Sequence, residues 1–143
     1  MLLISCDHAG FSLTGKIVKY LDKKSIKYVY YGPKEYEKTD SYVENACNAT
    51  KNFKDGDKLL LICGSGVGMS MVANKHKNIR AVLGYNTQIV KKAVQHNNAN
   101  CLCLGQNFIS YSKSIKMLNA FLLASFEGGR HQDRVDAMNN LIK

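Results

Sequence analysis

The sequence predicts an α/β protein, a three-layer α/β/α sandwich around a five-stranded parallel sheet in a Rossmann-like arrangement. Short apolar runs alternate with stretches of helical periodicity along the whole chain, which is the pattern of successive βαβ units. A length of 143 residues suits one domain with its own hydrophobic core. We therefore expect a single domain over residues 1–143, with residues 127–143 as a C-terminal tail and helix.

Three strands and two helices are predicted in the first half of the chain. The strands cover residues 2–6, 26–31 and 58–63, and the helices cover residues 12–24 and about 40–52. In the first helix, Leu13, Ile17 and Leu21 recur at helical spacing and define its buried face. A Gly-Pro turn closes the second strand and an Asp-Gly turn precedes the third.

Two strands and three helices are predicted in the following segment. The strands cover residues 80–84 and 100–104, and the helices cover residues 67–77, 87–96 and 112–125. In the middle helix, Ile89, Val90, Ala93 and Val94 are expected to point inward. Two adjacent glycines then interrupt the pattern before a short last helix.

Composition argues against a membrane protein. The chain is 45% hydrophobic and 22% charged, and no apolar run approaches the roughly 20 residues that span a bilayer. No basic residue precedes the short apolar stretch at the N-terminus, so this stretch does not resemble a secretory signal. We expect a cytoplasmic protein.

The five cysteines are expected to be reduced thiols. Their number is odd, and no two are spaced as C-x-x-C, the spacing of many zinc and redox sites. Cys101 and Cys103 lie in an alternating apolar run, where free cysteine usually serves as a small hydrophobic residue. No metal and no cofactor are expected.

The charge distribution favours a small anionic ligand. The net charge is +9, and residues 58–126 contain no Asp or Glu. Eight cationic residues fall in that segment: Lys58, Lys75, Lys77, Arg80, Lys91, Lys92, Lys113 and Lys116. They are scattered over several elements, without the dense basic run or interleaved aromatic residues of a nucleic-acid binder. Most of them are expected to lie on solvated helix faces, and no nucleic-acid partner is expected.

A glycine-rich loop follows the third predicted strand. Gly64, Gly66 and Gly68 let the backbone turn sharply and leave several amide groups available to an anion. Three familiar motifs fail on spacing. Met69 and Met71 stand where a dinucleotide fingerprint needs glycine, a Walker loop would need lysine, and a thiol phosphatase would need arginine at position 69.

Cys63 lies at the junction of the strand and this loop. Neighbouring amides at a helix start lower a thiol pKa and stabilise an enolate oxygen, so Cys63 is a candidate base or nucleophile. A buried structural cysteine at a strand end explains the position about equally well.

Other polar residues follow or precede predicted strands. Asp7 and His8 follow the first strand, although a helix cap and a surface histidine would look the same. His96 ends a helix, where the helix dipole alone favours it. Arg130 and Arg134 are spaced to grip one phosphate if the tail is helical, and are otherwise ordinary exposed arginines.

Four segments together carry a family resemblance. SCDHAG, ICGSGVGMS with ANK, QHNNANCLCLG and EGGRHQDRV occur in this order over nearly the whole chain. In this set the chain resembles the ribose-5-phosphate isomerase type B family, which includes the galactose-6-phosphate isomerase subunits. The resemblance implies metal-free isomerisation of a phosphorylated sugar, ribose 5-phosphate, through a cis-enediolate, in homodimers or homotetramers whose sites combine residues of two subunits.

The resemblance also implies roles for individual residues. Cys63 would move the proton between carbon 2 and carbon 1, Asp7 and His96 would open the sugar ring, and Ser65 would shuttle protons on the enediolate. The implied substrate-binding residues are His8, Gly64, Gly66, Val67, Gly68, Asn97, Arg130, Arg134 and His131.

Three departures from the family pattern concern the mechanism and the substrate. Some relatives replace the cysteine and use a glutamate five or six residues later, but this chain has Cys63 and Met69. Asn107 stands where many relatives carry arginine, and Ser41 replaces the tyrosine of D-Y-P, which removes an aromatic residue from that position. An isomerase of a six-carbon sugar phosphate, such as allose or galactose 6-phosphate, is therefore an alternative, and a non-catalytic sugar-phosphate binder is another.

Overall fold

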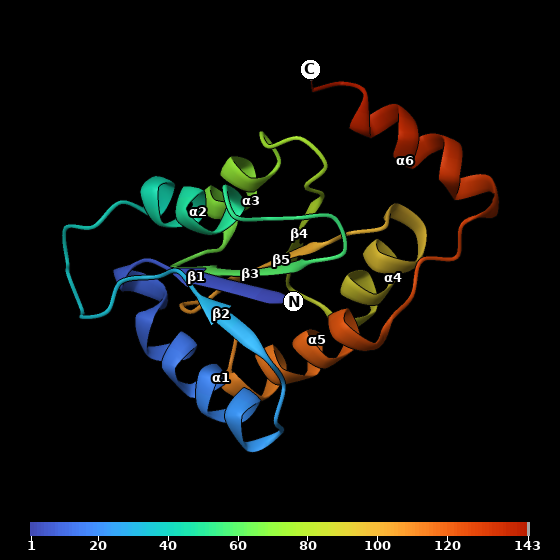
Figure 1. Ribbon diagram of the computed structural model, residues 1–143. Coiled ribbons are helices and arrows are strands. Elements are labelled where there is room, and N and C mark those ends of the chain that lie inside the picture. The colour runs from blue at the N-terminus through green and yellow to red at the C-terminus, as the bar shows by residue number, and fades with distance from the viewer. Residues whose placement is uncertain (143) are drawn as a thin grey trace.

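A computed structural model describes residues 1–142 as a three-layer α/β/α sandwich (Figure 1). Its five strands pair only in parallel, in the order β2-β1-β3-β5-β4. The strands are β1 (Leu2–Cys6), β2 (Tyr28–Tyr30), β3 (Lys58–Cys63), β4 (Ala81–Gly84) and β5 (Cys101–Gly105). The predicted fold class and the number of strands are therefore confirmed.

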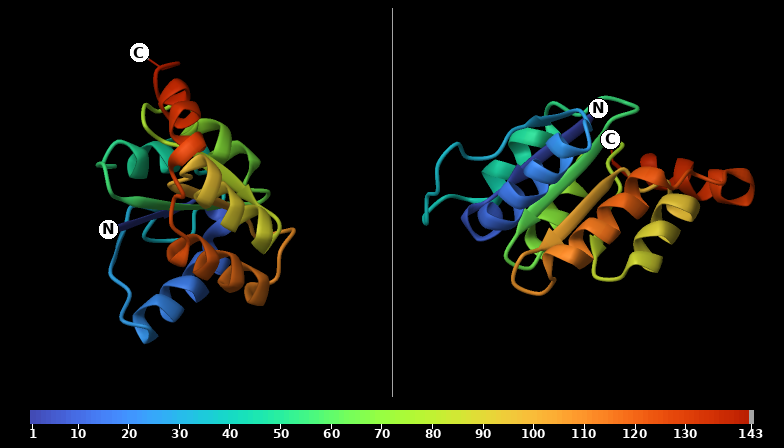
Figure 2. Two further views of the ribbon diagram at one scale, coloured as in Figure 1. Left: turned by 90° about the vertical axis from the view of Figure 1, so that its right-hand side faces the viewer. Right: turned by 90° about the horizontal axis from the view of Figure 1, so that it is seen from below.

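Helices cover both faces of the sheet. The helices are α1 (Phe11–Lys23), α2 (Tyr42–Thr50), α3 (Val67–Ala73), α4 (Thr87–Asn97), α5 (Tyr111–Leu123) and α6 (Gln132–Asn139). Two short 3-10 helices precede α1 and α6, at His8–Gly10 and Gly129–His131. Helices α2 and α3 lie on one face, and α1 and α5 lie on the other (Figure 1). Helix α6 stands out from the rest of the chain at the end that holds α4 (Figure 2).

Each face of the sheet has its own hydrophobic core. One core combines β1, β3 and β5 with Leu13, Ile17 and Leu21 of α1 and with apolar residues of α4 and α5. The second packs Met69 and Ala73 of α3, together with α2, against the opposite face. The central strands are buried on both faces, which explains why they appear in the sequence as continuous apolar runs.

Several element boundaries differ from the predicted ones. Helix α3 ends at Ala73, four residues early, because the Asn74 side chain pairs with both backbone groups of Ala81 and turns the chain toward β4. Helix α2 begins at Tyr42, since Ser41 is its N-cap and accepts a hydrogen bond from the amide of Glu44. The predicted inward position of Ile89 is wrong, because its side chain is 41% exposed.

The topology brings β1 and β3 side by side at the point where the chain reverses its direction across the sheet. In a doubly wound sheet, ligands bind outside the carboxyl ends of the strands at such a switch point. We call this side of the sheet the carboxyl edge, and the side where the strands begin the amino edge. Among the described residues, no helix has the length and apolar character needed to cross a membrane.

Candidate active site in two halves

Candidate residues from two strands meet at the carboxyl edge. The amide of Asp7, just after β1, donates to the carbonyl of Ile62 at 3.2 Å, so Asp7 lies beside the end of β3. We define the carboxyl-edge half-site by the predicted residues that lie here. They are Asp7, His8, Cys63, Gly64, Ser65, Gly66, Val67 and Gly68.

Cys63 is the last residue of β3 and is 5% exposed. The amide of Gly66 donates a hydrogen bond to its sulfur at 3.1 Å. Ser65 lies in the same turn with an exposed side chain, and its hydroxyl accepts from the amide of Val67 at 3.3 Å. The thiol therefore faces a tight turn of peptide amides, and the turn itself is open to solvent.

The expected lowering of the Cys63 pKa is wrong. Burial raises the pKa of the Cys63 thiol above its ordinary value, and the negative charge of Asp7 acts in the same direction. Hydrogen bonds from the amides of Met69, Gly66 and Ser65 oppose burial without cancelling it. Helix α3 has only seven residues, so its dipole is a short one.

Gly66 is required by the loop geometry. Its φ of 78° lies in the left-handed region, which disfavours side chains. A Cβ atom there would lie 2.7 Å from the side chain of Leu83 and 2.9 Å from the backbone of Leu104. The glycine-rich loop can therefore fold down onto β5 only with glycine at this position.

Asp7 has a structural contact as well as a place in the half-site. Its carboxylate accepts a hydrogen bond from the amide of Gly10 at 3.0 Å and caps the 3-10 helix. Burial raises the pKa of Asp7, while the Gly10 amide and the neighbouring His8 lower it to a smaller extent. This environment favours the protonated form of Asp7 more than water does.

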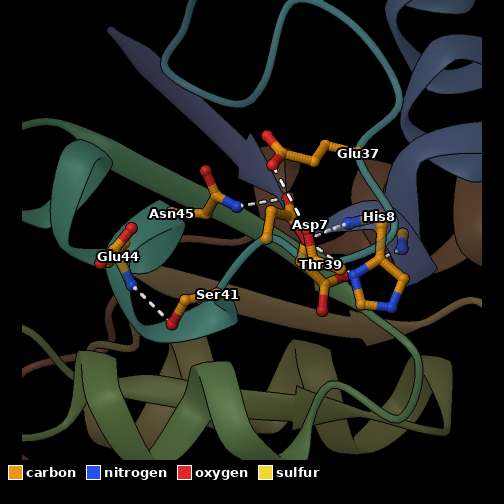
Figure 3. A network of polar contacts seen from close by, with 9 residues as sticks. Asp7, His8, Glu37, Thr39, Ser41, Glu44 and Asn45 are labelled. Carbon is orange, nitrogen blue, oxygen red and sulfur yellow. Dashed lines mark hydrogen bonds and ion pairs between the residues drawn. The ribbon is translucent and has the colours of Figure 1, made fainter.

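One residue of this half-site, Asp40, is not among the predicted site residues. Its Oδ1 accepts a hydrogen bond from the backbone amide of His8 at 3.0 Å and lies 2.7 Å from Nδ1 of the His8 ring. Figure 3 shows His8 and Asn45 on either side of the chain segment between Thr39 and Ser41. Because Asp40 is 32 residues from His8, no local spacing pattern could have linked the two.

Asn107, and Tyr42 next to Ser41, both contact the glycine-rich loop. The amide of Asn107 donates to the carbonyl of Gly64 at 3.0 Å, and its side-chain nitrogen would be 3.1 Å from a Cβ at Gly64. The ring of Tyr42 packs against Gly68, where an added Cβ would lie 2.7 Å from a ring carbon. An aromatic ring therefore still reaches the loop although Ser41 stands in the tyrosine position.

The remaining predicted residues lie at the opposite side of the sheet. Helix α4 runs back from the end of β4 to the start of β5, so its last residues lie at the amino edge. We define the amino-edge half-site as His96, Asn97, Arg130, His131 and Arg134. A strand of six residues, rising about 3.3 Å per residue, separates the two edges by about 15–20 Å. Within one chain, the structure does not bring His96 to Cys63.

The amino-edge half-site is a cluster of its own. The imidazole rings of His96 and His131 stack with their centroids 4.4 Å apart. Nε2 of His96 lies 3.6 Å from a carboxylate oxygen of Glu127, and the amide of Glu127 donates to the carbonyl of Gln95 at 2.9 Å. Glu127 was not predicted as a site residue, and it links the tail to the end of α4.

Both arginines of the tail are exposed. The guanidinium of Arg134 donates to the backbone carbonyl of Arg130 at 2.9 Å, which places the two residues one helical turn apart. The expected helical spacing is therefore present. Partial desolvation lowers the pKa of His131, and the electrostatic effects of His96, Arg130 and Arg134 lower it further. The carboxylate of Glu127 raises this pKa, but by less.

Two groups of metal-ligating side chains occur among the described residues, and neither is well arranged for an ion. In the group of His96, Glu127 and His131, the rings are only 11° from parallel, so an ion in the plane of one ring would lie out of the plane of the other. In the group of Asp7, His8 and Asp40, the ring nitrogen of His8 is already bonded to Asp40.

A groove of about 680 Å³ runs beside the open edge of the sheet, between β4, α4 and α6. Apolar side chains form most of its wall, among them Ile79, Leu83, Ile89 and Met138, and Asn97 lies at its margin. None of the carboxyl-edge half-site lines it. The groove is therefore a surface beside the amino-edge half-site and not a pocket around Cys63.

The strand order places the chain among the doubly wound α/β proteins, a class in which ligands bind outside the carboxyl ends of the strands. A family model described as Ribose/Galactose Isomerase matches residues 2–138. The chain belongs to this family of isomerases.

Individual relatives agree with this assignment. The chain is 41% identical over 138 residues to the probable ribose-5-phosphate isomerase B of Mycoplasma genitalium, covering 94% of this chain and 91% of that protein. It is 36% identical over 139 residues to ribose-5-phosphate isomerase B of Escherichia coli, covering 96% and 93%. The crystal structure of ribose-5-phosphate isomerase B from M. genitalium with bound ribulose-5-phosphate superposes with a TM-score of 0.93, at 39% identity, covering 98% and 94%.

Proposed function

We propose that this protein is a ribose-5-phosphate isomerase that interconverts ribose 5-phosphate and ribulose 5-phosphate. The observation that carries this proposal is the position of Cys63 at the switch point. Its sulfur accepts a hydrogen bond from the amide of Gly66 at 3.1 Å, and Asp7 lies beside the end of the same strand. Support comes from relatives bearing this name and from the related enzyme with bound ribulose-5-phosphate.

Proton transfer requires a base, donors for the developing oxyanion and a way to open the sugar ring. Cys63 as thiolate takes the proton from carbon 2 of the open-chain aldehyde, and the C–H electron pair forms the double bond of a cis-enediolate. The amides of Gly66 and Val67 already donate to the Cys63 sulfur and the Ser65 hydroxyl and shape the loop, which leaves the amides of Gly64 and Gly68 for the oxygen that becomes negative. A well-placed donor contributes about 3 kcal/mol.

The second half of the reaction returns the proton. Cys63 gives it to carbon 1 while the carbonyl forms at carbon 2, and the Ser65 hydroxyl passes a proton between the two oxygens. Asp7 and His96 exchange the protons needed to open the ring, a role suited to a carboxyl whose pKa burial raises. His8, Arg130 and Arg134 bind the phosphate, with His131 beside them, and Asn97 holds a sugar hydroxyl.

A complete site needs two copies of the chain. The two half-sites lie at opposite edges of one sheet, so His96 and the tail arginines of one copy would serve Cys63 of another. The apolar groove beside β4 and the projecting helix α6 provide a surface for such an assembly. We propose a homodimer or homotetramer with shared sites, in which residues 127–143 of the isomerase domain reach toward the neighbour. Residue 143 lies outside the described part of the chain.

The proposed enzyme is cytoplasmic and acts on a small phosphorylated sugar. It needs no metal and no other cofactor. The net charge of +9 then serves an anionic substrate and not a nucleic acid. A metal-assisted isomerase would lose activity in a chelator, whereas the thiol mechanism does not need an ion.

A coupled assay for ribulose 5-phosphate formation tests the function directly. We expect turnover of ribose 5-phosphate, undiminished by a chelator, and incorporation of deuterium at carbon 1 or carbon 2 when the reaction runs in heavy water. Binding of ribose 5-phosphate with neither turnover nor exchange would contradict the proposal and indicate a binding protein. The names of the relatives do not favour the alternative of an isomerase for a six-carbon sugar phosphate. A comparison of kcat/KM for ribose 5-phosphate, allose 6-phosphate and galactose 6-phosphate tests this alternative.

A further inference from the structure

Among the described residues, the His8 ring is hydrogen-bonded from one side only. Its Nδ1 lies 2.7 Å from Oδ1 of Asp40, and the backbone amide of His8 donates to the same oxygen at 3.0 Å. Asp40 is an acceptor here, because an ionised carboxylate has no proton to give. The Nδ1 of His8 therefore carries a hydrogen, and Nε2 is left on the opposite side of the ring without a hydrogen bond to any described residue.

Asp40 is itself held in place by the core. Its second oxygen accepts a hydrogen bond from the side-chain amide of Asn45 at 2.7 Å. Asn45 is 8% exposed, and its backbone carbonyl accepts a hydrogen bond at 2.7 Å from the hydroxyl of Ser5 in β1. Ser5 thus holds the Asn45 backbone, the Asn45 side chain holds Asp40, and Asp40 holds the His8 ring. Figure 3 shows Asn45 and His8 within these contacts.

The ionisation of Asp40 agrees with this arrangement. Partial burial alone would raise its pKa, but the hydrogen bonds from the amide and ring of His8 and from Asn45 bring the Asp40 pKa below its ordinary value. Because Ser41 caps α2, the Asp40 carboxylate is not needed as a helix cap. Its described partners are His8 and Asn45.

We propose that Asp40 is a positioning residue that fixes the His8 ring so that Nε2, which carries its own hydrogen in the phosphate complex, donates to the substrate phosphate. This inference rests on the proposed function, since His8 is assigned there to the phosphate. Orientation by Asp40 spares the ring a loss of rotational freedom when the phosphate binds. The phosphate is held equally in the ground state and the transition state, so Asp40 contributes to KM and not to kcat.

The Asp40→Asn variant tests the proposal, with Asp57→Asn as the matched control. Asp57 also lies in an ion pair, 3.0 Å from the N-terminal ammonium at the amino edge. We expect Asp40→Asn to raise KM for ribose 5-phosphate about tenfold with kcat within about twofold of wild type. Asp57→Asn should leave both constants within about twofold. In NMR spectra, the Nδ1–H signal of His8 should show a persistent hydrogen bond in wild type and in Asp57→Asn, and this signal should be lost in Asp40→Asn.

A double-mutant cycle separates positioning from general loosening of the structure. His8→Ala should weaken inorganic phosphate binding about tenfold, and adding Asp40→Asn to it should have less than about a twofold further effect. If thermal unfolding shows Asp40→Asn to be poorly folded, Asp40→Ala replaces it in the same cycle. Full additivity of the two changes, or an unchanged KM in Asp40→Asn, overturns the inference about Asp40.

These outcomes are distinct from failure of the proposed function. A wild-type protein that binds inorganic phosphate through His8 but does not turn over ribose 5-phosphate overturns the function. The phosphate titrations then decide the role of Asp40 alone. A wild-type enzyme that turns over the sugar while Asp40→Asn keeps its KM leaves the function standing and removes Asp40 from it.

Discussion

The amide of Gly66 donates a hydrogen bond to the sulfur of Cys63 at 3.1 Å, and this contact connects the thiol to the conformation of the glycine-rich loop. Gly66 provides that amide only because its backbone adopts a left-handed φ of 78°. The environment of the proposed base therefore depends on the geometry of the loop, and Cys63 and Gly66 can each be replaced by mutation.

Replacement of Cys63 by Ala is expected to lower kcat about 10²- to 10⁴-fold, the range over which a positioned base contributes. KM should change little, because the phosphate contacts come from other residues. Steady-state assays with ribose 5-phosphate measure both constants. Cys47→Ala is the matched control, since it removes a partly exposed thiol on α2 that has no part in the proposed mechanism, and it should keep wild-type turnover. Near-full activity in Cys63→Ala would exclude this thiol as the base.

The pH dependence of kcat/KM should report the pKa of the Cys63 thiol. Burial raises this pKa above its ordinary value, and the reactive form is the thiolate, so activity should keep rising with pH beyond the range in which an ordinary thiol titrates. Above about pH 7 the substrate phosphate is already doubly ionised and does not contribute to the slope. A plateau reached near neutral pH would show that the base has a lowered pKa or is another group.

Stability must be followed over the same pH range. Because the folded-state pKa of Cys63 lies above its unfolded value, the thiol contributes stability below the unfolded pKa. That contribution is lost as the pH rises through the folded pKa. Denaturant unfolding between pH 7 and 10 should therefore show a falling free energy of unfolding, while activity per folded molecule rises.

Gly66→Ala should destabilise the protein by about 2–4 kcal/mol, from left-handed strain together with contact against Leu83 and the backbone of Leu104. Gly15→Ala is the matched control, because Gly15 lies on an exposed face of α1 and an added Cβ there meets no atom within 4 Å. It should stabilise the protein by about 0.5–1 kcal/mol. Denaturant unfolding of the two variants gives the comparison, and equal effects would show that the loop tolerates a side chain at Gly66.

The architecture could be predicted from the sequence because the buried central strands are short apolar runs between helices of clear periodicity. The boundaries that failed depend on distant side chains. Helix α3 ends where Asn74 binds the backbone of Ala81, and no pattern within residues 67–77 encodes that contact. Ile89 was expected to be buried because periodicity defines an apolar face without showing which part of it remains uncovered.

The site residues also differ in whether neighbouring or distant parts of the sequence identify them. Cys63 and its loop could be identified because one contiguous segment contains both the thiol and the amides. Asp40 was missed because its partner His8 is 32 residues away and the pairing depends on how the loop after β2 folds back. The direction of the Cys63 pKa was wrong because a sequence shows neighbouring amides but not the extent of burial.

The separation of Cys63 and His96 leads to a prediction for mixed oligomers. Cys63→Ala and His96→Ala variants should each be nearly inactive, but refolding them together in equal amounts should restore about a quarter of wild-type activity. Half of the random dimers contain one chain of each kind, and each such dimer has one site with both residues intact and one site with neither. As a control, Cys63→Ala mixed with Asp7→Asn changes the same half-site in both chains, so no intact site can form. Recovery in the control, or no recovery in the first mixture, would show that His96 does not act on the thiol of a neighbouring chain.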